Sequence, residues 1–247
     1  MAELTWNKLT LFNPVTKKYW NIEIDGTIIR TYLNKGTVKE TEELKYPVDK
    51  AIQAVMAQFR KGFIYTNPNA NVGEAIFHCY VDKRQSYTGF MPIAARPDRD
   101  DFYIIRVIGK FEDEILYHYH ADGQLLSKNK LGSKRLTYRA ELDADGTLYF
   151  DNNHKMEHYD PKKAQFLSMT DVTTTKETTP EVVICKHLRI DFRGGRGKIE
   201  IWDNQNESLI MKLTDEFAVK KINCACSSNN LIVHTDYGVL SLYKMNI

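Results

Sequence analysis

Two short segments, 197–202 (GKIEIW) and 238–243 (GVLSLY), decide the fold of most of this chain. Each opens with a glycine and continues with branched apolar and aromatic residues, which favour β-strands. Their starting points, 197 and 238, lie 41 positions apart, which is a typical blade length in β-propeller repeats. A second similarity, between 121–125 (ADGQL) and 144–148 (ADGTL), has a spacing of 23, about half of that length. The longer spacing predicts propeller-like blades.

The sequence around these segments, from residue 102 onward, is a succession of short strand patterns without the period of a long helix. Turn-forming pairs such as Asp122-Gly123, Asp145-Gly146 and Tyr237-Gly238 separate them. At about 40 residues per blade there is room for about four blades; a barrel or a sandwich fits the same pattern. The predicted strands are Ala75–Val81, Tyr103–Ile108, Ile115–Tyr119, Leu136–Leu142, Thr147–Phe150, Met156–Tyr159, Val182–Cys185, Leu188–Phe192, Lys198–Trp202, Leu209–Leu213, Ala218–Cys224, Leu231–His234 and Val239–Tyr243.

The first 66 residues predict a different unit. Residues 18–24 (KYWNIEI) alternate apolar and polar side chains, Asp25-Gly26 signals a hairpin, and 27–33 (TIIRTYL) form the returning strand. A third strand is expected within 37–44. Residues 51–59 then place apolar side chains at helical spacing, after Pro47 and before Gly62. We expect a small antiparallel sheet with one helix packed across it.

This N-terminal unit resembles a WGR domain over about 60 residues. The resemblance rests on Leu11–Pro14, on Lys18–Trp20, and on a helix that ends in Lys61-Gly62-Phe63. The position of the Trp-Gly-Arg signature is occupied by Tyr32-Leu33-Asn34, so the arginine of the family is absent. WGR domains of poly(ADP-ribose) polymerases contact DNA ends and neighbouring domains. The resemblance therefore implies the fold, and loss of the arginine weakens the implied DNA contact.

The fold class predicted for the whole chain is α+β: a WGR-like module over residues 1–70, then an all-β region over 71–247. That region is either propeller-like or another multi-stranded antiparallel sheet. Trp202-Asp203 resembles the Trp-Asp ending of a WD repeat. The Thr-rich segment 171–180 is expected to be an exposed loop, because it offers little to bury.

Composition limits the function classes. The 247 residues carry 34 Lys and Arg against 32 Asp and Glu, a net charge of +2. The charge is evenly spread, whereas proteins that depend on phosphate contacts usually show a stronger basic bias. No apolar run has the length of a signal peptide or a membrane span. Four cysteines are too few for a disulfide scaffold, so a reducing cytoplasm is expected.

Three residue patterns are candidates for metal sites, and each has a simpler interpretation. His118 and His120 share one face of a predicted strand, but no further ligand stands at a recognisable distance. Cys224 and Cys226 share a strand face too, where free buried cysteines are common. The segment 143–146 (DADG) opens like a calcium loop but lacks the later ligands, so a hairpin turn is expected. We expect no metal and no cofactor.

The glycine-rich segment 193–197 (RGGRG) is the best candidate for an anion site, because Arg193 and Arg196 could both bind a phosphate. Lys18, Arg30 and Lys35 of the N-terminal unit complete the candidate set for nucleic-acid or anion binding. The sequence contains none of the usual phosphate-loop, dinucleotide or serine-nucleophile motifs. A catalytic triad built from distant residues is recognised only by geometry.

The function predicted from the sequence is that of a non-enzymatic binding or adaptor protein. Its partner is expected to be a protein, with assembly into a larger complex and no membrane contact. The alternative is a nucleic-acid-binding module that acts through the WGR-like unit, with weak binding. A second alternative is an enzyme with its site in the β region.

Overall fold

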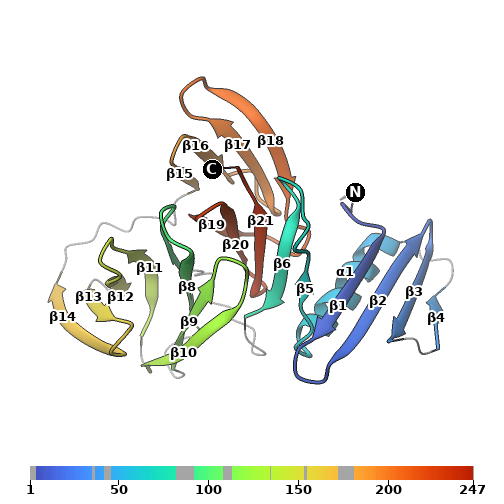
Figure 1. The fold of residues 1–247 in the computed structure, drawn as a ribbon, viewed down its shortest axis with the longest axis horizontal. Helices are drawn as coiled ribbons and strands as arrows, with labels where there is room; N and C mark the ends of the chain where they lie inside the picture. The colour runs from blue at the N-terminus through green and yellow to red at the C-terminus, as the bar shows by residue number, and fades with distance from the viewer. Residues whose placement is uncertain are drawn as a thin grey trace.

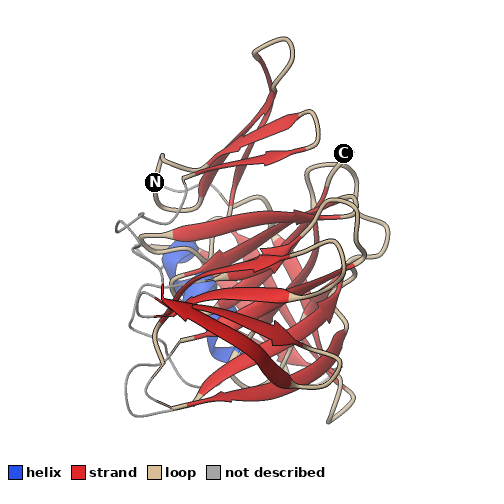
Figure 2. Ribbon diagram, turned by 90° about the vertical axis from the view of Figure 1, so that its left-hand side faces the viewer, coloured by secondary structure: helices blue, strands red, loops and turns tan. Residues whose placement is uncertain are grey.

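The computed structural model describes residues 4–34, 37–41, 46–81, 92–107, 113–133, 135–152, 155–171 and 181–246. This part of the chain is built from β-strands and one helix (Figure 2). The elements are β1 (Lys8–Asn13), β2 (Lys18–Asp25), β3 (Ile28–Leu33), β4 (Lys39–Thr41), α1 (Pro47–Phe59), β5 (Tyr65–Thr66), β6 (Ala75–Tyr80), β7 (Ile93–Ala95), β8 (Asp101–Arg106), β9 (Glu114–His120), β10 (Leu125–Gly132), β11 (Thr137–Leu142), β12 (Leu148–Asn152), β13 (Lys155–Asp160), β14 (Gln165–Asp171), β15 (Val182–Cys185), β16 (Leu188–Asp191), β17 (Lys198–Asp203), β18 (Ser208–Thr214), β19 (Ile222–Ser227), β20 (Asn230–Thr235) and β21 (Val239–Lys244).

The N-terminal unit is an antiparallel sheet, in the order β1-β2-β3-β4, with α1 packed on one face. The alternation in β2 turns Trp20 and Ile22 toward the helix, where Val55 and Phe59 are buried against them. Gly26 adopts a positive φ of 58° in the β2–β3 turn, a conformation that glycine reaches without steric cost. The predicted sheet, hairpin and helix are thus confirmed, while the finer assignment to the WGR fold stays a prediction. Of the third strand expected within 37–44, Lys39–Thr41 is observed, and 42–45 lie outside the described residues.

The rest of the described chain folds into four antiparallel sheets, three of four strands and one of five, arranged around a centre as in a β-propeller (Figure 1). Blade 1 is β7–β10, blade 2 is β11–β14, and blade 3 is β15–β18. Blade 4 combines β19, β20 and β21 with β6, which comes from the other end of the region. Within each blade, strands that follow one another in the sequence are neighbours in the sheet, β6 excepted. The propeller-like prediction is therefore supported by the strand order itself.

The 41-residue repeat corresponds to equivalent strands of two blades. Segments 197–202 and 238–243 contain β17 and β21, and both strands are third from the centre in their blades. The 23-residue similarity has no such meaning, because its two turns join different pairs of strands, β9–β10 and β11–β12. The turn motif recurs because Asp-Gly supplies the same backbone geometry in both places.

Three of the blade junctions have buried apolar cores. Blades 1 and 2 share a cluster that includes Ile105, Leu142 and Phe150. Blades 1 and 4 share a cluster around Ile104 and Leu242. Blades 3 and 4 share a third cluster. Its central members are Leu188, Ile190, Ile201, Leu231 and Val233.

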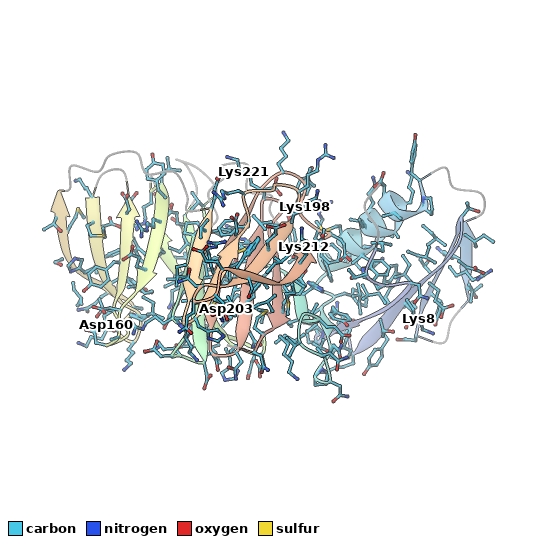
Figure 3. All side chains as sticks on the ribbon, turned by 90° about the horizontal axis from the view of Figure 1, so that it is seen from above. Lys8, Asp160, Lys198, Asp203, Lys212 and Lys221 are labelled. Carbon is cyan, nitrogen blue, oxygen red and sulfur yellow. A yellow bond between two sulfur atoms is a disulfide. The ribbon has the colours of Figure 1, made fainter. Side chains whose placement is uncertain are left out.

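The N-terminal unit is joined to the propeller by a shared core. Phe217 and Val239 belong to the same buried cluster as Val55 and Phe59. The rings of Phe59 and Phe217 meet edge to face, with their centroids 5.2 Å apart. β5 extends the blade 4 sheet on the side of this unit (Figures 1 and 3). The domain boundary at residue 70 stays a prediction.

Blades 1 and 2 are also joined by a buried ionic network. Arg135 lies in the β10–β11 connection and binds both carboxylate oxygens of Glu157 on β13. Its Nε donates to Glu114 on β9, whose carboxylate also accepts from the backbone NH and the hydroxyl of Thr137, at 2.7 and 2.6 Å. Glu114 is fully buried and Glu157 is 3% exposed. The two acids are stable in the core only because Arg135 and Thr137 pair with them.

Two cysteines form a disulfide across the junction between blades 3 and 4. This corrects the prediction that Cys226 is a free buried cysteine. Cys185 on β15 forms a disulfide with Cys226 on β19, and their Cα atoms are 6.1 Å apart. Both strands are the innermost strands of their blades, so the bond joins equivalent positions of consecutive blades. Cys226 is therefore not a free thiol. Cys79 and Cys224 are free and buried.

Most predicted strands are observed within one or two residues of their expected ends. The strand predicted at 218–224 is the exception, because the observed strand begins at Ile222. Four of the described strands were missed: the two-residue β5, and β7, β10 and β14. The loop prediction for 171–180 falls, after Asp171, outside the described residues.

Replacement of Trp20 by alanine should lower the free energy of unfolding by roughly 3–5 kcal/mol, because it removes a large core side chain. Trp20 is 7% exposed and packs on the helix. Tyr19, the next residue and 51% exposed, provides the matched control, and Tyr19→Ala should cost less than about 1 kcal/mol. Urea unfolding measures both. Equal midpoints for the two variants would contradict this packing.

Replacement of Arg135 by alanine should cost roughly 3–5 kcal/mol, since it leaves two buried carboxylates without their cation. Arg139→Ala is the control, because Arg139 pairs with Glu141 in a solvent-exposed position and such pairs contribute about 1 kcal/mol or less. Thermal and urea unfolding compare the two. A small effect of Arg135→Ala would mean that the network does not hold blades 1 and 2 together.

Candidate functional site

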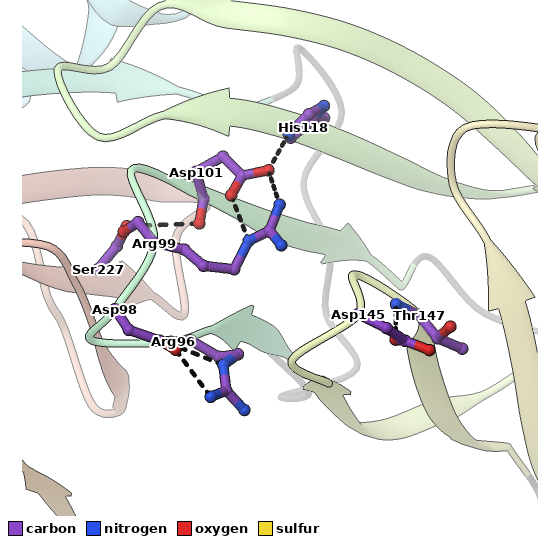
Figure 4. Close-up of polar contacts among 8 residues, drawn as sticks. All are labelled: Arg96, Asp98, Arg99, Asp101, His118, Asp145, Thr147 and Ser227. Carbon is purple, nitrogen blue, oxygen red and sulfur yellow. Dashed lines mark hydrogen bonds and ion pairs between the residues drawn. The ribbon is translucent and has the colours of Figure 1, made fainter.

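A polar cluster lies where turns of three blades meet (Figure 4). The β7–β8 loop of blade 1 carries Arg96, Asp98 and Arg99, the β11–β12 turn of blade 2 lies beside it, and β19 of blade 4 ends at Ser227. The Ser227 hydroxyl donates to the carbonyl oxygen of Arg99 at 2.7 Å. A Cβ atom at Gly146 would lie 3.5 Å from Nη1 of Arg99, so the β11–β12 turn lies beside this guanidinium. The loop is thereby hydrogen-bonded to blade 4 and adjacent to blade 2.

Two arginine–aspartate pairs give this cluster a fixed geometry. Arg96 donates from Nε and Nη2 to the two carboxylate oxygens of Asp98, each at 2.9 Å. Arg99 binds Asp101 in the same two-bonded manner, at 2.7 and 3.1 Å. About 30% of each arginine side chain remains exposed. Two-bonded pairs hold the planar guanidinium groups in defined orientations while leaving them accessible to a ligand.

His118 extends the cluster along blade 1. Its Nε2 atom lies 2.8 Å from Oδ2 of Asp101, and its ring stacks on Tyr103 with centroids 4.2 Å apart. Burial acts to raise the pKa of Asp101, but the hydrogen bonds from Arg99 and His118 outweigh it and lower that pKa overall. Burial raises the pKa of Tyr103 to about 12. At neutral pH the cluster therefore presents an ionised Asp101 with fixed donors.

The geometry of this cluster fits binding better than catalysis. A histidine held by an aspartate is one half of a nucleophilic triad, but the third member must lie within hydrogen-bond reach of the imidazole. Ser227, the hydroxyl in the cluster, donates instead to the backbone carbonyls of Arg99 and Asp101. Within the described residues, the cluster offers charged donors and acceptors without an activated nucleophile.

A second set of residues has the side-chain types of a hydrolase triad but is closed to substrates. His78 Nδ1 lies 2.9 Å from Oγ of Ser241, and the Asp215 carboxylate accepts from Tyr243 at 3.1 Å. His78, Ser241 and Asp215 are at most 5% exposed. Burial lowers the pKa of His78 to about 3, so its imidazole is a weak base, and raises that of Asp215 to about 6. We assign this set to the stability of blade 4.

The residues predicted for anion binding are not brought together by the fold. Lys18 and Arg30 lie on opposite faces of the N-terminal sheet, as the register of β2 with β3 requires. Nη1 of Arg30 lies 3.4 Å from Oδ2 of Asp25. Lys35 lies outside the described residues. Arg193 binds the carboxylate of Asp191, and Arg196 is exposed in the β16–β17 turn. Their role in anion binding stays a prediction.

Asn34, at the position of the missing signature arginine, has a structural task. It adopts a positive φ of 54°, a conformation that asparagine tolerates better than most residues. Its side-chain oxygen accepts from the backbone NH of Tyr19, and its own NH donates to the carbonyl oxygen of Tyr19. Asn34 thus closes the end of the β2–β3 hairpin.

Of the three metal candidates from the sequence, Cys226 is in the disulfide with Cys185 while Cys224 is a buried free cysteine, and the other two have other partners. His118 contacts Asp101, and His120 lies 3.0 Å from Asp122. Asp143 begins a turn in which its carbonyl accepts from the NH of Gly146, as the hairpin interpretation predicted. Within the described ranges, no group of three or more His, Cys, Asp and Glu side chains is arranged to hold a metal ion.

The sequence analysis did not identify the cluster at the three-blade turns, although a signal is present. Residues 96–101 (RPDRDD) contain two arginines, each followed two positions later by an aspartate. Pairs at this spacing can bind each other across a loop, but the participation of Gly146 and Ser227 depends on the ring of blades and has no local pattern.

Comparisons with solved structures found weak likenesses, several of them to β-propellers. The chain is similar to the structure of the Dos1 propeller, with 12% identity and a TM-score of 0.32, over 100% of this chain and 70% of that one. It is similar to the WD40 β-propeller domain of Doa1, with 12% identity and a TM-score of 0.25, over 93% and 61%. For the RRP9 WD40 repeats the values are 10%, 0.29, 67% and 54%. No protein-family model and no curated protein matches. These TM-scores are too low to support the propeller arrangement, which therefore rests on the order of the strands in the sheets.

One further observation concerns membranes. α1, the helix of the described residues, is 13 residues long, and no described helix is long and apolar enough to cross a bilayer.

The buried imidazole of His234 should make stability depend on pH. Burial lowers its pKa to about 4, below the 6.5 of the unfolded state, so unfolding takes up a proton between these values. His234 therefore favours the folded state above pH 6.5, and this contribution is lost as the pH falls toward 4. The difference in unfolding free energy between wild type and His234→Phe should shift by at most about 1.4 kcal/mol per pH unit in that window.

Urea unfolding of both proteins at pH 7, 6, 5 and 4 measures this difference, and the comparison cancels the other titrating groups. The wild type should lose stability relative to the variant as the pH falls. A difference that stays constant with pH would show that His234 is solvated or paired in solution.

Proposed function

We propose that this chain is a non-enzymatic binding protein whose partner is a protein. The observation that carries the proposal is the cluster of Arg96, Asp98, Arg99 and Asp101, whose two-bonded pairs hold the guanidinium groups in fixed orientations while leaving them partly exposed. A preorganised set of charged donors and acceptors loses little conformational entropy when a ligand binds. The described hydrolase-like set, in contrast, is buried.

Protein is a better match than nucleic acid for this surface. Each arginine in the cluster is already paired with a carboxylate, so the local charge is balanced, whereas phosphate binding needs a surplus of cations. Lys18 and Arg30 of the N-terminal unit point to opposite faces, which weakens the case for a phosphate-binding track there. The nucleic-acid alternative and an enzyme with a site in the β region are kept as competing hypotheses.

Affinity capture from native lysate tests the proposal, with and without nuclease. The wild-type chain is compared with a variant that combines Arg96→Ser and Asp98→Ser, which keeps the net charge. A control variant combines Arg139→Ser with Glu141→Ser, an exposed ion pair on β11, and it also keeps the net charge. We expect the wild-type chain and the control variant to capture a protein partner whether or not nuclease is added. The cluster variant should fail to capture that partner.

Two other results would count against the proposal. A partner that disappears on nuclease treatment would favour nucleic-acid binding, which a titration with 5′-phosphorylated duplex DNA at about 0.15 M salt would then quantify. A nuclease-resistant partner that both variants capture as well as wild type does would place the binding surface elsewhere.

A further inference from the structure

Two loops at one end of blades 3 and 4 are held against each other. The β16–β17 turn, residues 192–197, meets the β18–β19 loop, residues 215–221, through two backbone hydrogen bonds. The NH of Arg196 donates to the carbonyl oxygen of Lys220 at 3.3 Å, and the NH of Asp215 donates to that of Gly197 at 2.9 Å. A Cβ atom at Gly197 would lie 2.1 Å from the Asp215 carbonyl oxygen, so a side chain there would displace the loop. The two loops therefore form one fixed surface.

This surface gathers cations that have no carboxylate partner. The side chains concerned are Arg196, Lys198, Lys220 and Lys221, and all four are exposed. We call them the cationic surface. In the part of the chain that the structure describes, no ion pair joins these four side chains to a carboxylate. Figure 3 shows Lys198 and Lys221 toward one edge of the molecule, and Asp203, at the other end of β17, toward the opposite edge.

Two carboxylates border the cationic surface, and neutral donors hold both of them. Asp236, in the β20–β21 turn, accepts from the backbone NH groups of Val219 and Lys220 at 3.2 and 3.0 Å. It thereby fixes the loop that carries two of the four cations. Glu216 accepts from the backbone NH and the hydroxyl of Thr5, at 2.8 and 2.6 Å, and so faces the N-terminal unit.

The other charges nearby are paired among themselves. Nε of Arg193 lies 3.0 Å from each carboxylate oxygen of Asp191, and Glu181 lies on the same side, close to Arg193. Glu200, the next carboxylate along β17, pairs with Lys212 at 2.8 Å. Arg193, which the sequence suggested for anion binding, is thus occupied. The cations available to a ligand are the four of the cationic surface.

Apolar surface lies beside these cations. Val219 precedes Lys220 and is 47% exposed, and Tyr237 in the β20–β21 turn is 39% exposed. An apolar side chain of a ligand would remove part of this surface from water, which a phosphate backbone cannot do. The surplus of positive charge is also small once Asp236 and Glu216 are counted. A small surplus suits a few carboxylates better than a run of phosphates.

We propose that the cationic surface binds an acidic segment of a protein partner. Carboxylates of the segment pair with the lysines and with the guanidinium fork of Arg196, while an apolar side chain packs on Val219. The hydrogen bonds between the two loops fix the surface before binding, so little conformational entropy is lost. The arginine–aspartate cluster of blade 1 is a separate surface with a balanced charge, so the two proposals succeed or fail independently.

Fluorescence anisotropy tests the proposal at about 0.15 M salt. The probe is a short labelled peptide that alternates glutamate with leucine and valine, and its glutamine analogue is the reference peptide. We expect the combined variant Lys220→Gln, Lys221→Gln to bind the acidic peptide about tenfold more weakly than wild type, which corresponds to about 1.4 kcal/mol. The control variant combines Lys162→Gln with Lys163→Gln, two exposed lysines of the β13–β14 turn. It makes the same change in net charge and should bind as wild type does.

Charge reversal provides a second readout, which a purely structural role of the two lysines would not move. The variant Lys220→Glu, Lys221→Glu should lose the acidic peptide. It should bind a peptide with lysine in place of each glutamate more tightly than wild type does. Urea unfolding of each variant checks that the fold is kept.

Four outcomes would overturn the proposal. The first is a wild-type chain that does not bind the acidic peptide, and the second is a glutamine analogue that binds equally well. The third is equal binding by the Lys220/Lys221 variant and the Lys162/Lys163 control. The fourth is a single-stranded oligonucleotide that displaces the acidic peptide at a lower concentration than the unlabelled peptide itself, which would assign the cationic surface to nucleic acid.

Discussion

The pairing of β6 with β21 is the constraint on which the rest of the structure depends. These strands lie near opposite ends of the propeller region, and their register aligns Cys79 with Leu240 and His78 with Ser241. Without β6, blade 4 would lack its fourth strand, and the ring would lose the junction between its first and last segments. The same pairing also places β5 and the N-terminal sheet beside blade 4, since β5 follows α1 directly and pairs with β6. One strand pair thus fixes both the ring and the attachment of the N-terminal unit.

Different interactions hold neighbouring blades together at the three packed junctions. Blades 1 and 2 combine an apolar core with the Arg135 network, blades 1 and 4 rely on aliphatic and aromatic packing, and blades 3 and 4 add a disulfide. This variety explains why no single repeated motif is visible along the sequence. Each blade keeps the strand order of its neighbours, while the residues that join the blades are specific to each junction.

The sequence predicted the local structure well and the interactions between blades poorly. The period-two pattern and Asp-Gly turns located β2, β3, β17 and β21, because both signals depend on neighbours along the chain. β10 was missed because its outer position exposes most of its side chains, so Leu125–Gly132 has no alternation to detect. The Cys185–Cys226 bond, the Arg135 network and the three-blade cluster each join residues from different blades. Their partners are set by ring geometry, which no window of sequence contains.

The disulfide has a consequence for the covalent topology of the chain. It closes a loop with a sequence separation of 41 residues, and this loop contains β16, β17, β18 and most of β19. In the chain-entropy model, closing a loop of this length restricts the unfolded ensemble by about 4 kcal/mol. A single cut of the backbone anywhere between residues 186 and 225 leaves the two halves joined through sulfur. Blade 3 can therefore be nicked by a protease without any fragment leaving the molecule, until a reductant opens the bond.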